Sequence, residues 1–213
     1  MYKQKVVLGV APTKRSFLSM EEAKRQKDKF MARIRAIKPE AVEIIDVDEL
    51  CENGIMWDTA KIPAVVEKFR RVGIDALFLP FCDFGEEQVV AQIAGAFKVP
   101  TLVWGARDER PNSDEVRGRD TQCGMFAATK VLRRYGVKYS YIWNCETESD
   151  DFAKGYENFI RVAAVLKALK NLRVAKIGER PVPFMSVMTN EANLINRIGI
   201  TTVPISPFAV AER

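Results

Sequence analysis

The chain has 213 residues, of which 47% are hydrophobic and 29% charged, with a formal net charge of +5. This balance is ordinary for a globular protein and excludes an intrinsically disordered one. There is no histidine, which excludes Ser-His-Asp and Cys-His nucleophiles and every histidine-ligated metal site within the chain.

The sequence also lacks the patterns of membrane, secreted and nucleic-acid-binding proteins. Its longest apolar stretches, such as residues 74–81, fall far short of the ~20 residues of a membrane span, and no secretory signal is visible. Acids and bases are interspersed, so the positive charge does not indicate a nucleic-acid surface. Four widely spaced cysteines without a CxxC pair, Cys51, Cys82, Cys123 and Cys145, predict reduced thiols, no zinc site and a cytoplasmic location.

Short β-rich runs alternate with helical stretches along the first 172 residues. Strands are predicted at 5–10, 42–47, 74–80, 101–104 and 139–143. The first two helices begin at Ser19 and Thr59 as N-caps, and the other three cover 86–97, 122–135 and 150–169. Because the run at 74–80 is apolar on both faces, we expect it at the centre of the sheet.

This alternation indicates an α/β fold with an open parallel sheet and helices on both faces. Five β-α units are typical of a flavodoxin-like or a Rossmann-like domain. Neither GxGxxG nor GxxxxGK[ST] occurs in the sequence, which argues against a dinucleotide or nucleoside triphosphate site.

A new cycle begins after Leu172, with a strand at 173–178, a helix capped by Thr189 or Asn190, and a strand at 201–205. Two strands and one short helix cannot bury a core of their own. They either pack onto the first domain or open a second one, and the fresh β-α-β pattern favours the second. We therefore predict a domain over residues 1–172 and an incomplete, similar domain over 173–213.

Ligands of open parallel sheets bind beyond the carboxyl ends of the strands. The candidates at that edge are Arg15 after the first strand, Cys82, Asp83, Phe84, Glu86 and Glu87 after the third, and Trp104 and Arg107 at the fourth. Aromatic faces and charged groups together are typical of polyol recognition. Each candidate also has a purely structural interpretation, as a core thiol, an aromatic plug, a turn or a surface ion pair. The long loop over 105–121 is of a length that is usually functional or disordered.

The segments at 80–87 (PFCDFGEE), 102–109 (LVWGARDE) and 119–124 (RDTQCG) occur in an order that resembles the N-terminal domain of the L-fucose isomerase and L-arabinose isomerase family. Residues 173–181 and 184–187 are similar to the start of that family's second domain. The resemblance covers the whole chain.

The resemblance implies aldose–ketose interconversion by proton transfer between C1 and C2, assisted by Mn²⁺ or a similar divalent ion. The family's metal and acid–base residues lie in later domains, so we expect this chain to hold no catalytic residue, metal ligand or cofactor, and to be inactive alone. It also implies a homo-oligomer in which this domain lines a neighbour's monosaccharide site. Carried over by motif, Arg15 and Cys82-Asp83-Phe84 would line it. Some fucose enzymes place a Trp where Asp83-Phe84 stands, which leaves the sugar open.

Three hypotheses follow. The first is the N-terminal portion of a sugar isomerase. It supplies one wall of a neighbour's site through Arg15, Cys82, Asp83, Phe84, Glu87, Trp104 and Arg107. The alternative is a stand-alone, non-catalytic module that binds a small polar or sugar ligand. The third is a carboxylate-based enzyme that uses Asp83, Glu86 or Glu87.

Overall fold

The computed structural model describes residues 5–111, 113–114, 117–170 and 172–212. The chain divides into two compact units, Met1–Ala163 and Ala164–Arg213. Within the described ranges, no helix combines the length and the apolar character needed to cross a bilayer.

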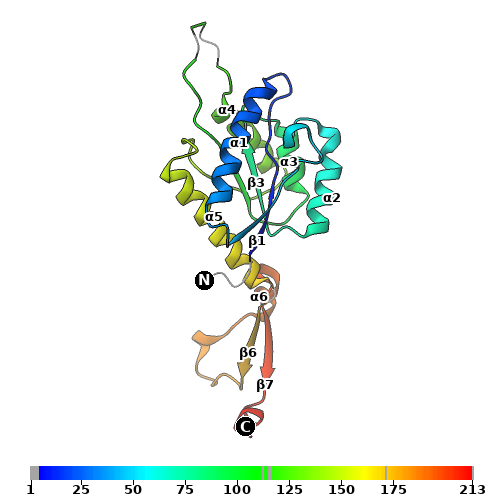
Figure 1. The fold of residues 1–213 in the computed structure, drawn as a ribbon. Coiled ribbons are helices and arrows are strands. Elements are labelled where there is room, and N and C mark those ends of the chain that lie inside the picture. Colours follow the sequence, from blue (N-terminus) through cyan, green and yellow to red (C-terminus); the bar gives the residue numbers. More distant parts are fainter. Residues whose placement is uncertain (1–4, 112, 115–116, 171, 213) are drawn as a thin grey trace. The chain divides into compact units, whose positions relative to one another are not determined.

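The first unit contains a parallel sheet with helices around it (Figure 1). The sheet has five strands in the order β2-β1-β3-β4-β5, which is the flavodoxin-like order. Its strands are β1 (Val6–Val10), β2 (Val42–Ile45), β3 (Ala76–Phe81), β4 (Thr101–Gly105) and β5 (Ser140–Tyr141). The predicted open parallel α/β fold is confirmed, and β3 lies at the centre with all six residues buried. β5 is shorter than predicted, because its pairing with β4 is confined to Ser140 and Tyr141.

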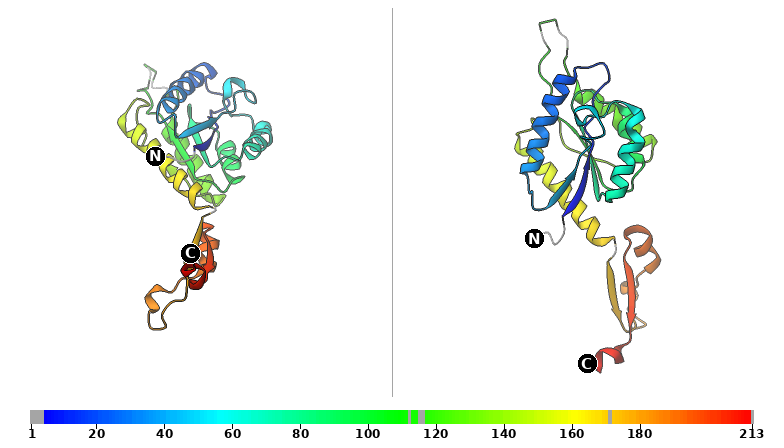
Figure 2. Two further views of the ribbon diagram at one scale, coloured as in Figure 1. Left: turned by 60° about the horizontal axis from the view of Figure 1, so that its bottom comes forward. Right: turned by 45° about the vertical axis from the view of Figure 1, so that its right-hand side comes forward.

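Helices cover both faces of this sheet (Figure 2). One face carries α1 (Met20–Ala36) and α5 (Asp150–Leu169), and the other carries α2 (Ile62–Val72), α3 (Glu87–Gly95) and α4 (Thr121–Arg134). Under α1 and α5 the core is aromatic: the Trp104 ring lies 6.2 Å from Phe30 and 4.3 Å from Phe152. Under α2, α3 and α4 the buried cluster is mainly aliphatic.

Local signals explain most helix ends. The Ser19 hydroxyl accepts a hydrogen bond from the Glu22 N–H at 3.2 Å, so the predicted cap of α1 is confirmed. The prediction that Thr59 caps the second helix is wrong. The Asp58 carboxylate instead accepts from the Ala60 N–H at 2.9 Å and starts a 3-10 turn, Thr59–Lys61, that runs into α2. Another 3-10 turn, Glu52–Gly54, precedes it.

The second unit has two parallel strands, β6 (Arg173–Ile177) and β7 (Thr201–Ile205), connected through a 3-10 turn (Met185–Val187) and α6 (Glu191–Ile198). Of the two predicted caps for α6, the structure selects Asn190, whose side chain accepts from the Asn193 N–H at 3.0 Å. A short helix, α7 (Pro207–Ala211), was not predicted. No described residue of this unit is buried.

Candidate functional site

The carboxyl edge of the sheet brings the loop after β1 against the loop after β3. Thr13 connects them: its N–H donates to the Pro80 carbonyl, and its carbonyl accepts from the Cys82 N–H, both at 2.9 Å. Its hydroxyl also accepts from the Glu86 N–H at 2.9 Å, just before α3. These bonds fix Arg15, two residues further on, beside residues 83–87.

Asp83 fastens the same two loops with one carboxylate oxygen. That oxygen accepts from the N–H of Arg15 at 2.7 Å and of Gly85 at 2.9 Å. Burial raises the pKa of Asp83, and these two backbone bonds oppose the shift only in part. Gly85 has φ +72°, and a Cβ there would collide with the Phe81 ring. The turn therefore needs glycine, because an L side chain would be strained and would not fit.

Arg15 is held by contacts on two sides. Its Nη1 donates to Glu86 Oε1 at 3.0 Å, and its Nη2 lies 3.9 Å from Glu87 Oε1. The guanidinium carbon lies 4.5 Å from the centroid of the Phe84 ring, which is a cation–π arrangement. The side chain keeps 18% exposure. The result is a pre-oriented group of hydrogen-bond donors over an aromatic face.

A second cluster closes the base of the long loop after β4. Arg119, which is 3% exposed, donates from Nε to both oxygens of Glu109 (3.1 and 2.9 Å) and from Nη2 to the Arg107 carbonyl at 2.6 Å. Burial alone would raise the pKa of Glu109, but the hydrogen bond from Arg119 lowers it overall. Asp108 accepts from the Thr121 N–H at 3.0 Å, which attaches the loop to the start of α4.

The two clusters meet at a pocket of about 310 Å³, lined by Arg15, Phe17, Leu18, Phe84, Arg117, Arg119 and Asp120. It combines guanidinium donors with the apolar faces of two phenylalanines. α4 packs tightly against the Phe84 loop, because a Cβ at Gly124 would overlap the Phe84 carbonyl oxygen. Such a lining suits a ligand that carries both hydroxyl groups and C–H surface.

The structure separates the seven predicted site residues into groups. Arg15 and Phe84 line the pocket, and Asp83 and Glu87 support them from the same loop and the first turn of α3. The remaining three do not line this pocket. Cys82 is fully buried, and burial raises the pKa of its thiol well above the usual range. Trp104 is fully buried in the aromatic core, and Arg107 is exposed in the cluster around Arg119.

Three residues that the sequence did not single out contribute to the site. Phe17 and Arg119 line the pocket. Lys14 is 2% exposed and donates to the carbonyls of Arg15 at 2.7 Å and Ser16 at 3.2 Å, which shapes the loop that carries Arg15. Each of the three lies in or beside a segment that follows the end of a strand, and this position is the sequence feature that could have identified it. The burial of Lys14 and Arg119 depends on how the loops fold and is not visible in the sequence, whereas Phe17 remains 82% exposed beside the pocket.

The site does not fit a divalent metal ion. Across the described ranges, no three Cys, Asp or Glu side chains gather in a way that could hold one. At the pocket itself, the carboxylates of Glu86 and Glu109 are engaged by Arg15 and Arg119. The donor set offers cationic hydrogen-bond donors where a hard cation requires free oxygen ligands.

Known proteins resemble this chain mainly in its first unit. A family model described as fucose/sulfoquinovose isomerase, N-terminal domain, matches residues 9–170. A sulfoquinovose isomerase of Priestia aryabhattai is 23% identical over 155 residues, which is 71% of this chain and 33% of that protein. One of Alkalicoccus urumqiensis is 26% identical over 144 residues, 65% of this chain and 31% of its own length. The chain thus matches about a third of the length of these relatives.

Among solved structures, the azoreductase AzrA aligns with a TM-score of 0.33 at 11% identity, over 75% of this chain and all of that one. An azoreductase from Bacillus anthracis str. Sterne gives 0.33 at 13% identity, over 76% of this chain and all of its own. Likeness at this level carries no argument about function. The family model that matches residues 9–170, in contrast, shows the family: the chain belongs to the fucose/sulfoquinovose isomerase family and contains its N-terminal domain.

Proposed function

We propose that this chain is the N-terminal portion of an aldose–ketose sugar isomerase, and that its pocket forms one wall of a monosaccharide site completed by a neighbouring subunit. The observation that carries the proposal is the Arg15 guanidinium, held over the Phe84 ring by Glu86 within the region that the family model matches. A planar donor beside an aromatic face binds sugar hydroxyls and C–H groups together.

The proposal assigns no proton-transfer step to this chain. Cys82 is a buried neutral thiol, the buried Asp83 carboxyl accepts two backbone N–H groups with one of its oxygens, and Glu86 is engaged by Arg15. The acid–base and metal-binding groups would belong to the larger part of the enzyme, since the chain matches only about a third of the length of its relatives. Alone, it should be inactive.

The other expected properties follow the same proposal. Full-length protein would be a homo-oligomer, because the pocket is open and needs a second wall. It would act on monosaccharides in the cytoplasm, because four free cysteines, three of them buried, suit a reducing compartment. The substrate would be a 6-deoxy or 6-sulfo sugar, since the matching family is described by fucose and sulfoquinovose.

Nuclear magnetic resonance with L-fucose, L-arabinose and sulfoquinovose tests this proposal on the 213-residue chain. We expect weak, millimolar binding that shifts the Arg15 side-chain and Phe84 ring signals, and we expect Arg15→Ala to abolish it. Arg161→Ala is the matched control, because Arg161 is exposed on α5 and pairs with Glu157 on the same helix.

Each other outcome decides between the hypotheses. Submillimolar binding would favour the stand-alone binding module, because one wall of a shared site should bind poorly. No shift at the pocket would overturn its role in sugar recognition. Isomerisation by the isolated chain in the presence of Mn²⁺ would show that the catalytic groups are in this chain after all.

A further inference from the structure

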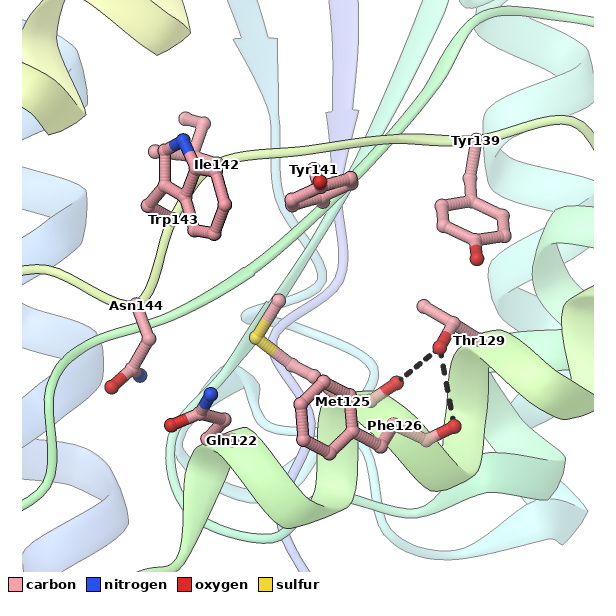
Figure 3. Close-up of a pocket in the computed structure, with 9 residues that line it drawn as sticks. All are labelled: Gln122, Met125, Phe126, Thr129, Tyr139, Tyr141, Ile142, Trp143 and Asn144. Atoms are coloured by element: carbon pink, nitrogen blue, oxygen red, sulfur yellow. Dashed lines mark hydrogen bonds between the residues drawn. The ribbon is translucent and has the colours of Figure 1, made fainter.

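An aromatic groove lies on the open edge of the sheet, between β5 and α4, away from the loops that carry Arg15. It is a pocket of about 240 Å³. Tyr139, Tyr141 and Trp143 project into it from the extended segment around β5, and Met125 and Phe126 face them from α4 (Figure 3). The proposed sugar site does not use any of these side chains.

The exposure of this groove is unusual for a surface in water. Trp143 is 75% exposed, Phe126 67% and Tyr141 58%. Residue alternation explains how they gather: Tyr139, Tyr141 and Trp143 share one face of an extended segment, while Ile142 points the other way and packs near Gly155 under α5. Contiguous exposed aromatic surface of this kind marks an interaction site.

The backbone at this edge is also available for a partner. β5 is the last strand of the sheet, and among the described residues its outer side pairs with no other strand. Unpaired N–H and C=O groups on an edge strand are a template for the strand of another chain. The groove therefore offers both apolar contacts and strand-edge contacts to the same occupant.

Charge identifies the occupant. At the amino end of β5 the exposed charges are basic: Lys130, Arg133, Arg134 and Lys138. After its carboxyl end acids outnumber bases: Glu146, Glu148, Asp150 and Asp151 are exposed there, beside the exposed Arg107 and Lys154. If a second copy docks with its β5 antiparallel, the basic end of each copy meets the acidic end of the other. A parallel arrangement would bring like charges together.

We propose that this edge is a two-fold interface between two copies of the chain, with β5 antiparallel to β5 and the aromatic groove at its centre. A two-fold contact is self-complementary, so a surface with opposite charge at its two ends satisfies both halves at once. The inference deepens the homo-oligomer of the proposed function by assigning it a surface, but its test is independent of sugar binding.

Sedimentation velocity of the 213-residue chain over a wide concentration range provides the test. We expect a monomer–dimer equilibrium that is weakened about tenfold or more by Trp143→Ala and by Phe126→Ala, as for aromatic residues at the centre of an interface. Phe208→Ala is the control, because Phe208 is 79% exposed in the second unit. These side chains are exposed, so the variants should keep the far-ultraviolet circular dichroism of the parent.

A charge-swap experiment tests whether opposite charges meet across the interface. The double variants Arg133→Glu/Arg134→Glu and Glu146→Lys/Glu148→Lys should each be monomeric, and an equimolar mixture should recover dimers. The proposal is overturned if the chain stays monomeric at every concentration, if Phe208→Ala weakens association as much as Trp143→Ala, or if the mixed variants fail to associate. A sugar that shifts the Trp143 signal of a monomeric chain would instead assign the groove to a ligand.

Discussion

The two units of the chain show how differently the same β-α-β pattern can be stabilised. In the first unit, helices cover both faces of the sheet, and β3 and β4 are buried along their whole length. In the second, every residue of β6 is exposed, and apolar side chains such as Ile177 (59%) and Phe184 (58%) face solvent. Secondary structure can therefore form without a core, but burial of apolar area is what stabilises a fold.

This contrast supports the proposal that the second unit belongs to a larger domain. Its strands and α6 have good local signals, including the Asn190 cap and a left-handed Gly199 after the helix. Among its own described residues no second layer covers the apolar side chains, and the domain predicted to begin at 173 would need one.

The largest expected effect compares core substitutions in the two units. Trp104→Ala should lower the free energy of unfolding by about 3–5 kcal/mol, because the indole is fully buried between Phe30 and Phe152. Ile177→Ala, at an exposed position in β6, should change it by less than about 0.5 kcal/mol. Equilibrium urea unfolding measures both. Equal losses would break the comparison and show that Ile177 is buried in solution.

The next largest effect compares the loss of unfolding free energy when a buried arginine and an exposed arginine of the first unit are removed. Arg119→Ala should cost about 2–3 kcal/mol, since it leaves Glu109 and the Arg107 carbonyl without their buried donor. Arg117→Ala is the matched control: its side chain is 60% exposed and, among the described residues, forms an exposed local pair with Asp120 at 3.4 Å, so its loss should cost about 0–1 kcal/mol. The same urea series measures both, and similar losses for the two arginines would contradict the assigned role of Arg119.

The smallest expected effect is a pH dependence of stability, with opposite signs in the two units. Burial raises the native pKa of Asp83, so between its usual pKa of 3.8 and the raised value the native state binds more protons than the unfolded state. This group therefore makes stability fall as pH rises through that window. Glu191, in the second unit, has its pKa lowered by hydrogen bonds from Thr202 and Lys176, so its contribution is lost as pH falls.

Thermal unfolding across the acid range checks the sign at Asp83. Asp83→Asn keeps an oxygen acceptor for Arg15 and Gly85 but cannot ionise. We expect this variant to lose the decline that begins near pH 3.8. Glu191→Gln should leave that decline in place. An unchanged pH profile in Asp83→Asn would show that the buried carboxyl is not the group responsible.

Much of the fold could be predicted because its signals are local. Hydrophobic periodicity and caps located every described strand and every described α-helix except α7, but none of the 3-10 turns, and the bounds of α5 agree with the prediction. The predicted element bounds were wrong where two local sequence signals compete. Asp58 and Thr59 are adjacent cap residues, and the carboxylate makes the cap. β5 was predicted too long because the aromatic run around it resembles a strand, while its pairing with β4 ends at Val103 and Tyr141.

The candidate site was predictable in position but not in detail. The carboxyl edge of the sheet follows from the α/β pattern, and Arg15 and Phe84 do line the pocket there. Trp104 also ends a strand, yet α1 and α5 cover it completely, because which face of a strand end is covered depends on helices far away in the sequence. Arg119 could not be identified for a different reason: its burial is created by the folding of its own loop around Glu109 and Arg107.

The sequence alone determined the order of strands and helices, the parallel α/β class and the family, since periodicity, caps and motif order are properties of neighbouring residues. Tertiary structure alone decided the strand order β2-β1-β3-β4-β5, the stacking of Arg15 on Phe84, and the aromatic edge beside β5. Each of these depends on contacts between segments that are distant along the chain. Such contacts form only when the chain buries its apolar surface, and no local pattern specifies them.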